Sequence, residues 1–257
     1  MRKLRQNLNL LSVLCRANFR SSDYRSFAGA LWSFMGPLIV FSVTYFIFVD
    51  RFGRHISYFP LTLLSGIITI SYFSSTITYT MRFFPAHREI LMNSRAPSSV
   101  LLPASLFVPS IKFFVEFTLC IIIAFSLRIL EPQKLAVALA LIPFLILLAV
   151  GIGLCLAVLS QLAGDVREIW LVFSQMLLFT TPIFYQLPMI SPLARTLIVF
   201  FNPVTPFILS FQSLLTGHPV PYFHTGTLVQ AAAYGLAGFF TGWTYFKRME
   251  RQMVEKL

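Results

Sequence analysis

The sequence predicts an all-α membrane protein with six transmembrane helices. Hydrophobic residues make up 57% of the 257-residue chain and charged residues only 11%. The mean hydropathy is +0.77, and a soluble domain of this size rarely has so few charges. The charges gather in short connections between uncharged runs, several of them long enough to cross a hydrocarbon core of about 30 Å.

The first element is a basic, only intermittently apolar segment, residues 1–26. It lacks the long apolar run and the small-residue cleavage site of a signal peptide. Leu4, Leu8, Leu11 and Cys15 fall near one face of a helix, with Arg and Asn elsewhere. We therefore expect an amphipathic helix on the cytoplasmic membrane surface, with a flexible basic tail as the alternative.

Six apolar runs predict the membrane spans. The fifth is the shortest and just crosses a bilayer at about 1.5 Å rise per residue. Most Lys and Arg lie before the first run, after the second and fourth, and in the tail 247–257. The positive-inside rule then places both termini in the cytoplasm, and it accounts for the net charge of +11 without a nucleic-acid partner. The runs are Phe27–Val49, Phe59–Met81, Leu101–Leu127, Leu135–Leu162, Ile169–Tyr185 and Thr225–Phe246.

The segment 186–224 is nearly as apolar as the spans, but prolines interrupt it. Pro188, Pro192, Pro203 and Pro206 exclude one straight helix, and Arg195 is the only Lys, Arg, Asp or Glu. Interrupted backbone at membrane depth is tolerated only where protein or a water-filled cavity covers it. We expect short re-entrant helices here that form the outer gate of a pathway.

The connection 82–100 carries a second proline-bounded segment. Pro85 favours a helix start after it and Pro97 a stop before it, with Ile90 and Leu91 among charged neighbours. The pattern is typical of a short amphipathic helix at the membrane edge, suited to docking a motor subunit. An ordinary solvated loop helix fits the pattern equally well.

Catalytic and nucleotide-binding motifs are absent from the sequence. It contains no G-x-x-x-x-G-K-[ST] phosphate loop, no G-x-G-x-x-G and no H-E-x-x-H. We expect no cofactor, no metal and no enzymatic activity in this chain. Lys112 and Glu116 are spaced i, i+4 within the third run, which favours a structural ion pair over a proton relay. A carrier without a chain of titratable groups needs an energy source outside this polypeptide.

Several short motifs then match a known family in order and spacing. The motifs are Gly29-Ala30-Leu31-Trp32-Ser33-Phe34-Met35-Gly36-Pro37, Leu64-Ser65-Gly66, the connection from Pro85 to Pro97, Gly164-Asp165-Val166-Arg167-Glu168-Ile169, Thr180-Thr181-Pro182-Ile183-Phe184-Tyr185 and Asn202-Pro203-Val204-Thr205-Pro206. Over essentially its full length the chain resembles the membrane subunit of type-2 ABC exporters for bacterial cell-surface polysaccharides, the permeases for O-antigen, capsule and teichoic acid. One departure is Ala163-Gly164, where many members have an aromatic residue or Phe-Arg before the Asp.

The resemblance implies a homodimer in the bacterial cytoplasmic membrane with two ATP-binding cassette subunits, which would bind ATP and Mg. It implies a lipid-linked polysaccharide as cargo, moved through a channel between the two copies. A small-molecule or lipid exporter with the same fold is the main alternative, and a membrane-embedded transferase acting on lipid-linked sugars is a weaker one. The residues expected to couple to the ATPase are Arg88, Glu89, Leu91, Met92, Asn93, Arg95, Asp165 and Arg167.

Aromatic residues are candidates for a glycan pathway because sugar rings stack on aromatic faces. The alternative is that they pack between helices or lie at the membrane interfaces. Glycines in the fourth and sixth runs predict close helix packing, within one subunit by default. The pathway candidates are Trp32, Phe34, Tyr72, Phe73, Phe179, Phe184 and Tyr185.

Overall fold

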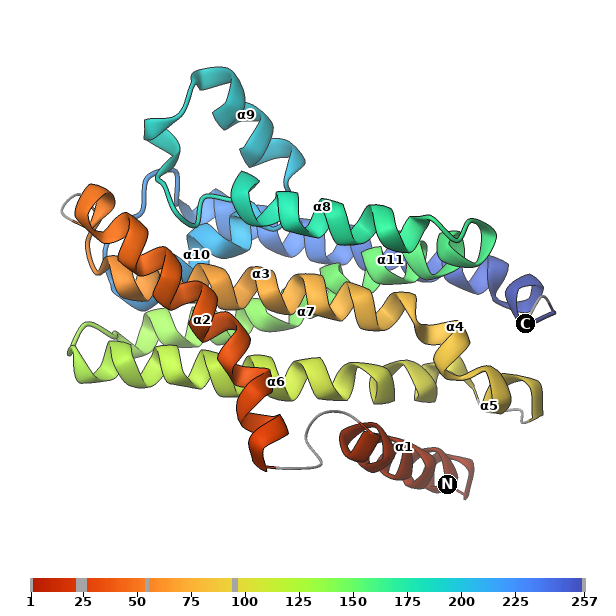
Figure 1. The fold of residues 1–257 in the computed structure, drawn as a ribbon. Coiled ribbons are helices and arrows are strands. Elements are labelled where there is room, and N and C mark those ends of the chain that lie inside the picture. Colours follow the sequence, from red (N-terminus) through yellow and green to blue (C-terminus); the bar gives the residue numbers. More distant parts are fainter. Residues whose placement is uncertain (1, 22–26, 54–55, 94–96, 256–257) are drawn as a thin grey trace.

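The protein is a bundle of helices (Figure 1). The computed structural model describes residues 2–21, 27–53, 56–93 and 97–255, excluding the side chains of 2–6, 19–21, 27–34, 51–52 and 93. Every regular element within these ranges is helical, as predicted. The long helices are α1 (Arg2–Ser21), α2 (Phe27–Phe52), α3 (Phe59–Met81), α6 (Ser98–Ser126), α7 (Pro132–Leu162), α8 (Val166–Thr180) and α11 (Thr225–Glu255).

Helices α3, α6, α7, α8 and α11 run along one axis, and α2 crosses them obliquely (Figure 1). The two described termini lie at the same end, which we call the proximal end; the opposite end is the distal end. At the proximal end α1 packs on α6, and the Asn18 side-chain amide donates to the Ala104 carbonyl at 2.9 Å. Termini at one end are what an even number of crossings requires.

Length and composition make this a multi-pass membrane protein. Helices α3, α6 and α7 are long and apolar enough to span a bilayer, and a bent pair of shorter helices would make a fourth span. The described apolar part of α2 is Met35–Asp50, α8 has 15 residues, and α11 carries Lys247, Arg248 and Arg251 in its last turns. The count of six spans therefore stays a prediction.

The bent pair lies in the segment where prolines interrupt the apolar sequence. Helix α9 (Pro192–Phe201) and helix α10 (Thr205–Thr216) meet at 95°. Pro192 and Pro206 stand in the first turns of these helices, where the missing N–H costs no hydrogen bond. The predicted break into short helices is confirmed. Their re-entrant placement in a membrane stays a prediction.

Helix α10 forms the centre of the core. All twelve of its residues are buried, among α3, α6, α7 and α11. In contrast, α9 has no buried residue. Helix α10 is enclosed although it carries polar side chains, because most of these side chains find partners: Ser210 and Gln212 donate to backbone carbonyls. Helix α9 lies on the outside of the bundle.

The glycines of α7 and α11 face each other. This agrees with the expectation that they allow two helices of one chain to pack closely. A Cβ on Gly242 would lie 2.0 Å from the Gly151 carbonyl oxygen. A Cβ on Gly235 would lie 2.5 Å from the Phe144 carbonyl oxygen. Because glycine has no side chain, the backbones of α7 and α11 can approach each other closely. Close packing of this kind stabilises helix pairs in a bilayer, where the hydrophobic effect does not drive helices together.

Several expected boundaries differ from the structure by about one turn, and three differences are larger or change an element. The fifth helix ends at Thr180 rather than Tyr185, because Thr181 precedes Pro182 and is extended (φ −82°, ψ 144°). The last helix continues to Glu255, so the expected tail 247–257 is largely part of α11. The connection 82–100 holds two short helices instead of one, α4 (Phe83–Ala86) and α5 (Arg88–Asn93). Pro85 lies inside α4. This helix is a single turn, so the missing N–H group of Pro85 breaks no helical hydrogen bond.

Candidate functional site

The α4–α5 corner at the proximal end is anchored to α11 by aromatic side chains. Phe83 and Phe84 are fully buried, and each ring centroid lies 5.4 Å from that of Phe246. His87, between the two short helices, is buried with its Nδ1 atom 2.9 Å from the Phe83 carbonyl oxygen. Burial lowers the pKa of His87 from its ordinary value of 6.5, against an opposing contribution of that carbonyl.

Phe83, Phe84 and Phe246 belong to a cluster of buried side chains that is separate from the main core and joins most elements of the proximal end. Leu101 of α6 and Leu154 of α7 are buried in it, and Leu14 of α1 packs against it. Ile90 and Leu91 of α5 rest on the same cluster. Helix α5 therefore shares this cluster with α7 and α11, and a close-packed contact of this kind can transmit strain between the three helices.

Several predicted coupling residues lie on the outside of this corner. Arg88 and Glu89 are exposed, and Met92 is 57% exposed. Leu91 is half-buried, and Asp165 is exposed in the turn before α8. The side chain of Asn93 and the whole of Arg95 lie outside the described residues.

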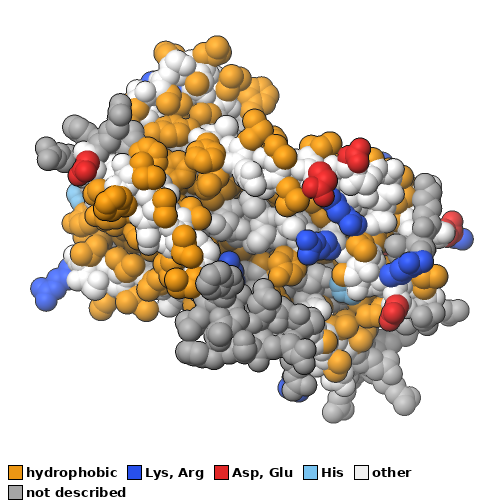
Figure 2. Space-filling model, in the orientation of Figure 1, with side chains coloured by type: hydrophobic (Ala, Val, Ile, Leu, Met, Phe, Trp, Pro, Cys, Tyr) orange, Lys and Arg blue, Asp and Glu red, His pale blue; other side chains and the backbone are white. Residues whose placement is uncertain are grey.

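A cavity of about 450 Å³ opens beside this corner, between the ends of α3 and α4 and the start of α8. Its walls include Arg82, Arg167 and Glu168, and the buried Trp170. The Trp170 indole N–H donates to the Thr78 hydroxyl at 3.0 Å, which ties α8 to α3. Figure 2 shows basic and acidic side chains gathered toward the proximal side of the visible face. Arg167, expected at the ATPase surface, thus lines a cavity.

Beyond the cavity, α8 carries an uncovered apolar face. Of its residues only Trp170 and Leu177 are buried. The oblique α2 is similarly uncovered, with Phe46 at 83% exposure. Hydrophobic side chains cover much of the face formed by these helices (Figure 2). A water-soluble monomer rarely exposes so much apolar surface, so these faces contact lipid or another chain. The exposed apolar residues of α8 include Ile169, Leu171, Val172, Phe173, Met176 and Phe179.

The predicted pathway aromatics fall into two groups. Tyr72 and Phe73 are buried in the core, where the Tyr72 ring lies 4.3 Å from Phe113 and the Phe73 ring lies 6.5 Å from Trp170. These two side chains therefore pack between helices within one chain. The side chains of Trp32 and Phe34 lie outside the described residues.

The second group gathers at the distal end of α8. Phe184 is 6% exposed and lies between Phe48 and the exposed Phe179, with both centroid distances 5.8 Å. Tyr185 is half-buried, and its hydroxyl donates to the Thr180 carbonyl at 3.0 Å. Sequence reasoning missed Phe173 and Phe201, which are exposed on α8 and α9. The composition of a charge-free span does not reveal which face is covered.

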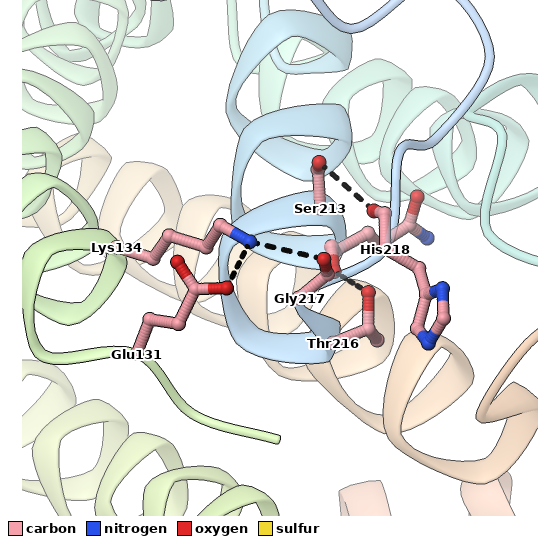
Figure 3. Close-up of polar contacts among 7 residues, drawn as sticks. Glu131, Lys134, Ser213, Thr216, Gly217 and His218 are labelled. Carbon is pink, nitrogen blue, oxygen red and sulfur yellow. Dashed lines mark hydrogen bonds and ion pairs between the residues drawn. The ribbon is translucent and has the colours of Figure 1, made fainter.

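Polar contacts hold the distal end together. The Lys134 ammonium of α7 donates to Glu131 Oε1 at 2.8 Å and to the Gly217 carbonyl at 3.0 Å, at the C-terminal end of α10 (Figure 3). A cation is favourable there because the helix dipole is negative at its C-terminus. Gly217 has φ +70°, and a Cβ there would lie 2.8 Å from the Ile129 carbonyl oxygen. The end of α10 is thus both capped and sterically closed.

Arg195 organises the prolines around α9. Its guanidinium donates to the carbonyls of Leu187, Pro188 and Ile190 at 3.1, 3.4 and 3.2 Å and to the Tyr222 hydroxyl. It also lies over the Tyr222 ring, 5.1 Å from the centroid. The only Lys, Arg, Asp or Glu of this segment therefore joins the loop before α9 to the loop before α11.

The intramembrane charges pair as predicted. Lys112 Nζ lies 3.9 Å from Glu116 Oε1 on α6. The Glu116 carboxylate also borders an apolar cavity of about 490 Å³ between α2, α3 and α6. Within the described ranges no group of three or more His, Cys, Asp or Glu side chains is arranged to hold a metal ion.

These features define the class of protein: a multi-pass helical membrane protein with one charged, cavity-bearing end and one end built from proline-started helices. No protein-family model matches the chain. Three curated relatives, however, confirm the resemblance to permeases of type-2 ABC exporters, and all three are named O-antigen export system permease protein RfbA.

The similarity extends over most of each sequence. The relative from Myxococcus xanthus is 26% identical over 226 residues, 86% of this chain and 85% of its own. One relative from Klebsiella pneumoniae is 22% identical over 260 residues, 99% of both chains. A second from the same organism is 26% identical over 228 residues, 86% of both chains. The chain is thus similar to transport subunits rather than to enzymes.

Proposed function

We propose that the chain is the permease subunit of an ATP-driven exporter that moves a lipid-linked polysaccharide across the bacterial cytoplasmic membrane. The single observation that carries this proposal is the near full-length similarity to permeases named for O-antigen export. In the proposed orientation the proximal end is cytoplasmic, with both termini and the amphipathic α1 on that side. The segment 186–224 then lies at the outer face.

Two copies of the chain and two ATP-binding cassette subunits form the proposed assembly. The uncovered apolar faces of α2 and α8 support a pathway between the two copies, with Phe179 and Tyr185 at its outer end. ATP and Mg are bound by the partner subunits. Their closure pushes on α5, and the Phe83, Phe84 and Phe246 contacts pass this motion to α11.

The proposal is tested with the full chain, affinity-tagged and co-expressed with an ATP-binding cassette subunit from the same organism. The double variant Arg88→Glu, Met92→Glu places negative charge on the exposed side of α5. We expect it to retain less than about a tenth of the co-purified ATPase, because charge repulsion and desolvation at a docking surface cost several kcal/mol. The matched control is Met189→Glu, exposed to 45% at the distal end against 57% for Met92.

Transport is measured separately, as ATP-dependent accumulation of lipid-linked glycan in inverted membrane vesicles. Accumulation should require an ATPase subunit with an intact phosphate loop. Export by the permease alone, or an α5 double variant that keeps both partner and export, would contradict the coupling scheme. Export of a small molecule or a lipid without glycan would leave the permease class intact and refute the proposed cargo.

A further inference from the structure

The cavity lined by Arg82 and Arg167 is built like a binding site. Its volume of about 450 Å³ falls within the roughly 300–1,000 Å³ of small-molecule sites. Trp170 forms a fixed wall, since its indole N–H is bonded to Thr78. Helices α3, α4 and α8 all contribute residues to the lining, so the site depends on the fold rather than on one loop.

Neither arginine side chain has an acceptor among the residues that the structure describes. The Arg167 Nε atom is buried and makes no hydrogen bond. Neither guanidinium forms an ion pair with a residue in the described part of the chain, and this includes Glu168 in the same wall. Arg82 is exposed and Arg167 is half-buried, so the Arg167 Nε–H is the donor here that is both buried and without a partner. Buried polar groups are normally satisfied, and this one favours an acceptor that comes from outside the chain.

Phosphate is the acceptor that this geometry fits. The planar guanidinium group presents paired N–H donors that match phosphate oxygens, and such pairs are strong even beside other charges. Two arginines and one carboxylate leave one net positive charge in the lining. Because Glu168 weakens the attraction for any anion, a multiply charged phosphate is favoured over a monovalent anion.

The surface next to the cavity indicates what the phosphate is attached to. Leu171 belongs to the cavity wall and to the exposed face of α8, and Val172 and Phe173 continue that face. A ligand with its charged head between the arginines would lay its chain along this apolar face. We infer that the Arg82–Arg167 cavity binds the phosphate head of a phosphorylated lipid. The inference rests on the proposed function, for which it names the part of the cargo that the cytoplasmic end binds.

The test measures ligand binding to the full chain in nanodiscs of zwitterionic lipid, without any transport assay. Three probes separate the chemistry: geranylgeranyl diphosphate, geranylgeraniol with the same chain and no phosphate, and inorganic diphosphate with no chain. Arg82→Gln and Arg167→Gln should each weaken geranylgeranyl diphosphate binding about tenfold, the effect of losing a charge-assisted hydrogen bond. Arg167→Lys keeps the charge but loses the fork, and we expect an intermediate loss. Arg248→Gln, at an exposed arginine of α11 at the same end, is the matched control and should change the affinity less than about twofold.

Each alternative has its own outcome. Equal binding of inorganic diphosphate would show a free-anion site and overturn the lipid assignment. Equal displacement of the probe by phosphatidylglycerol in the nanodisc would assign the cavity to membrane headgroups and overturn the cargo assignment. If the arginine variants bind the probe like the unaltered chain but lose the ATPase subunit, the arginines are docking residues and the inference is wrong. Phosphate binding that persists when no ATPase co-purifies would refute the proposed function but not the site.

Discussion

At the scale of single residues, His87 makes the proximal corner sensitive to acid. Its pKa is lowered because burial penalises the charged imidazole. Below the ordinary pKa of 6.5 the unfolded chain therefore binds a proton that the folded chain does not. The free energy of unfolding falls as the pH drops through this value, and the loss is complete below the lowered pKa of the folded state.

We expect the thermal midpoint of the detergent-solubilised chain to fall between about pH 7.5 and pH 5. The variant His87→Gln should lose part of this dependence, because position 87 no longer titrates. His224→Gln, at an exposed histidine of the distal end, is the control and should keep the full dependence. An unchanged acid response in His87→Gln would rule out this histidine as its source.

Arg195 is the second residue whose contacts predict a measurable effect. Arg195→Met removes a guanidinium that bridges three carbonyls and the Tyr222 hydroxyl. We expect about 1–3 kcal/mol of lost stability, together with faster proteolysis of residues 186–191, because charge-assisted hydrogen bonds are lost. Arg128→Met, at an exposed position of the same end, provides the comparison. Equal protease resistance in the two variants would refute the bridging role.

At the scale of elements, the crossing of α7 and α11 depends on glycine. Gly242→Ala would place a Cβ 2.0 Å from the Gly151 carbonyl oxygen. We expect a loss of about 1–3 kcal/mol or more, as for overpacked cores, measured as a lower thermal midpoint in detergent. Gly36→Ala in α2 is the matched control. It makes the same substitution at a position where the new Cβ would meet nothing within 4 Å. Comparable midpoints for the two variants would mean that the helices separate freely.

The elements show how far the sequence predicts this fold. The expected run Phe59–Met81 coincides with α3, because long apolar runs between charges locate helices well. Helix ends depend on local backbone chemistry, which apolar runs do not report. Pro182 ends α8 five residues early, and Pro85 is absorbed into the single turn of α4. Full burial of α10 is a tertiary outcome that its short sequence does not indicate.

The sequence predicted the candidate site less completely than the helices, because the site depends on how helices pack against one another. The motifs located the Gly164–Glu168 turn and the α4–α5 connection, but not that they meet at a cavity. Phe73 and Phe179 looked equivalent in sequence, yet one is 1% exposed and the other 66%. Only the packing of α8 against α3 decides between them, and that packing includes the Trp170–Thr78 hydrogen bond and the contact between the Trp170 and Phe73 rings.

At the scale of the whole molecule, the proposed pathway predicts which apolar face meets water. Phe173 of α8 and Ile122 of α6 are exposed to 51% and 58%, so each is open in a single chain. In membranes with the ATPase partner, Phe173→Cys should react with a water-soluble maleimide several times faster than Ile122→Cys, because lipid excludes the charged reagent. Reaction of both cysteines at one rate would contradict a pathway along α8.

The glycine contact between α7 and α11 also constrains how the chain is made. A ribosome releases α7 well before α11, so the main partner of α7 does not yet exist when that helix enters the membrane. Helix α10 is in the same position, since α11, which forms part of its enclosing wall, follows it in the chain. The centre of the protein therefore closes only after α11 has been made. We expect a chain cut short within α11 to leave Gly151 and one side of α10 uncovered, and to be degraded by membrane proteases rather than to accumulate as a smaller permease.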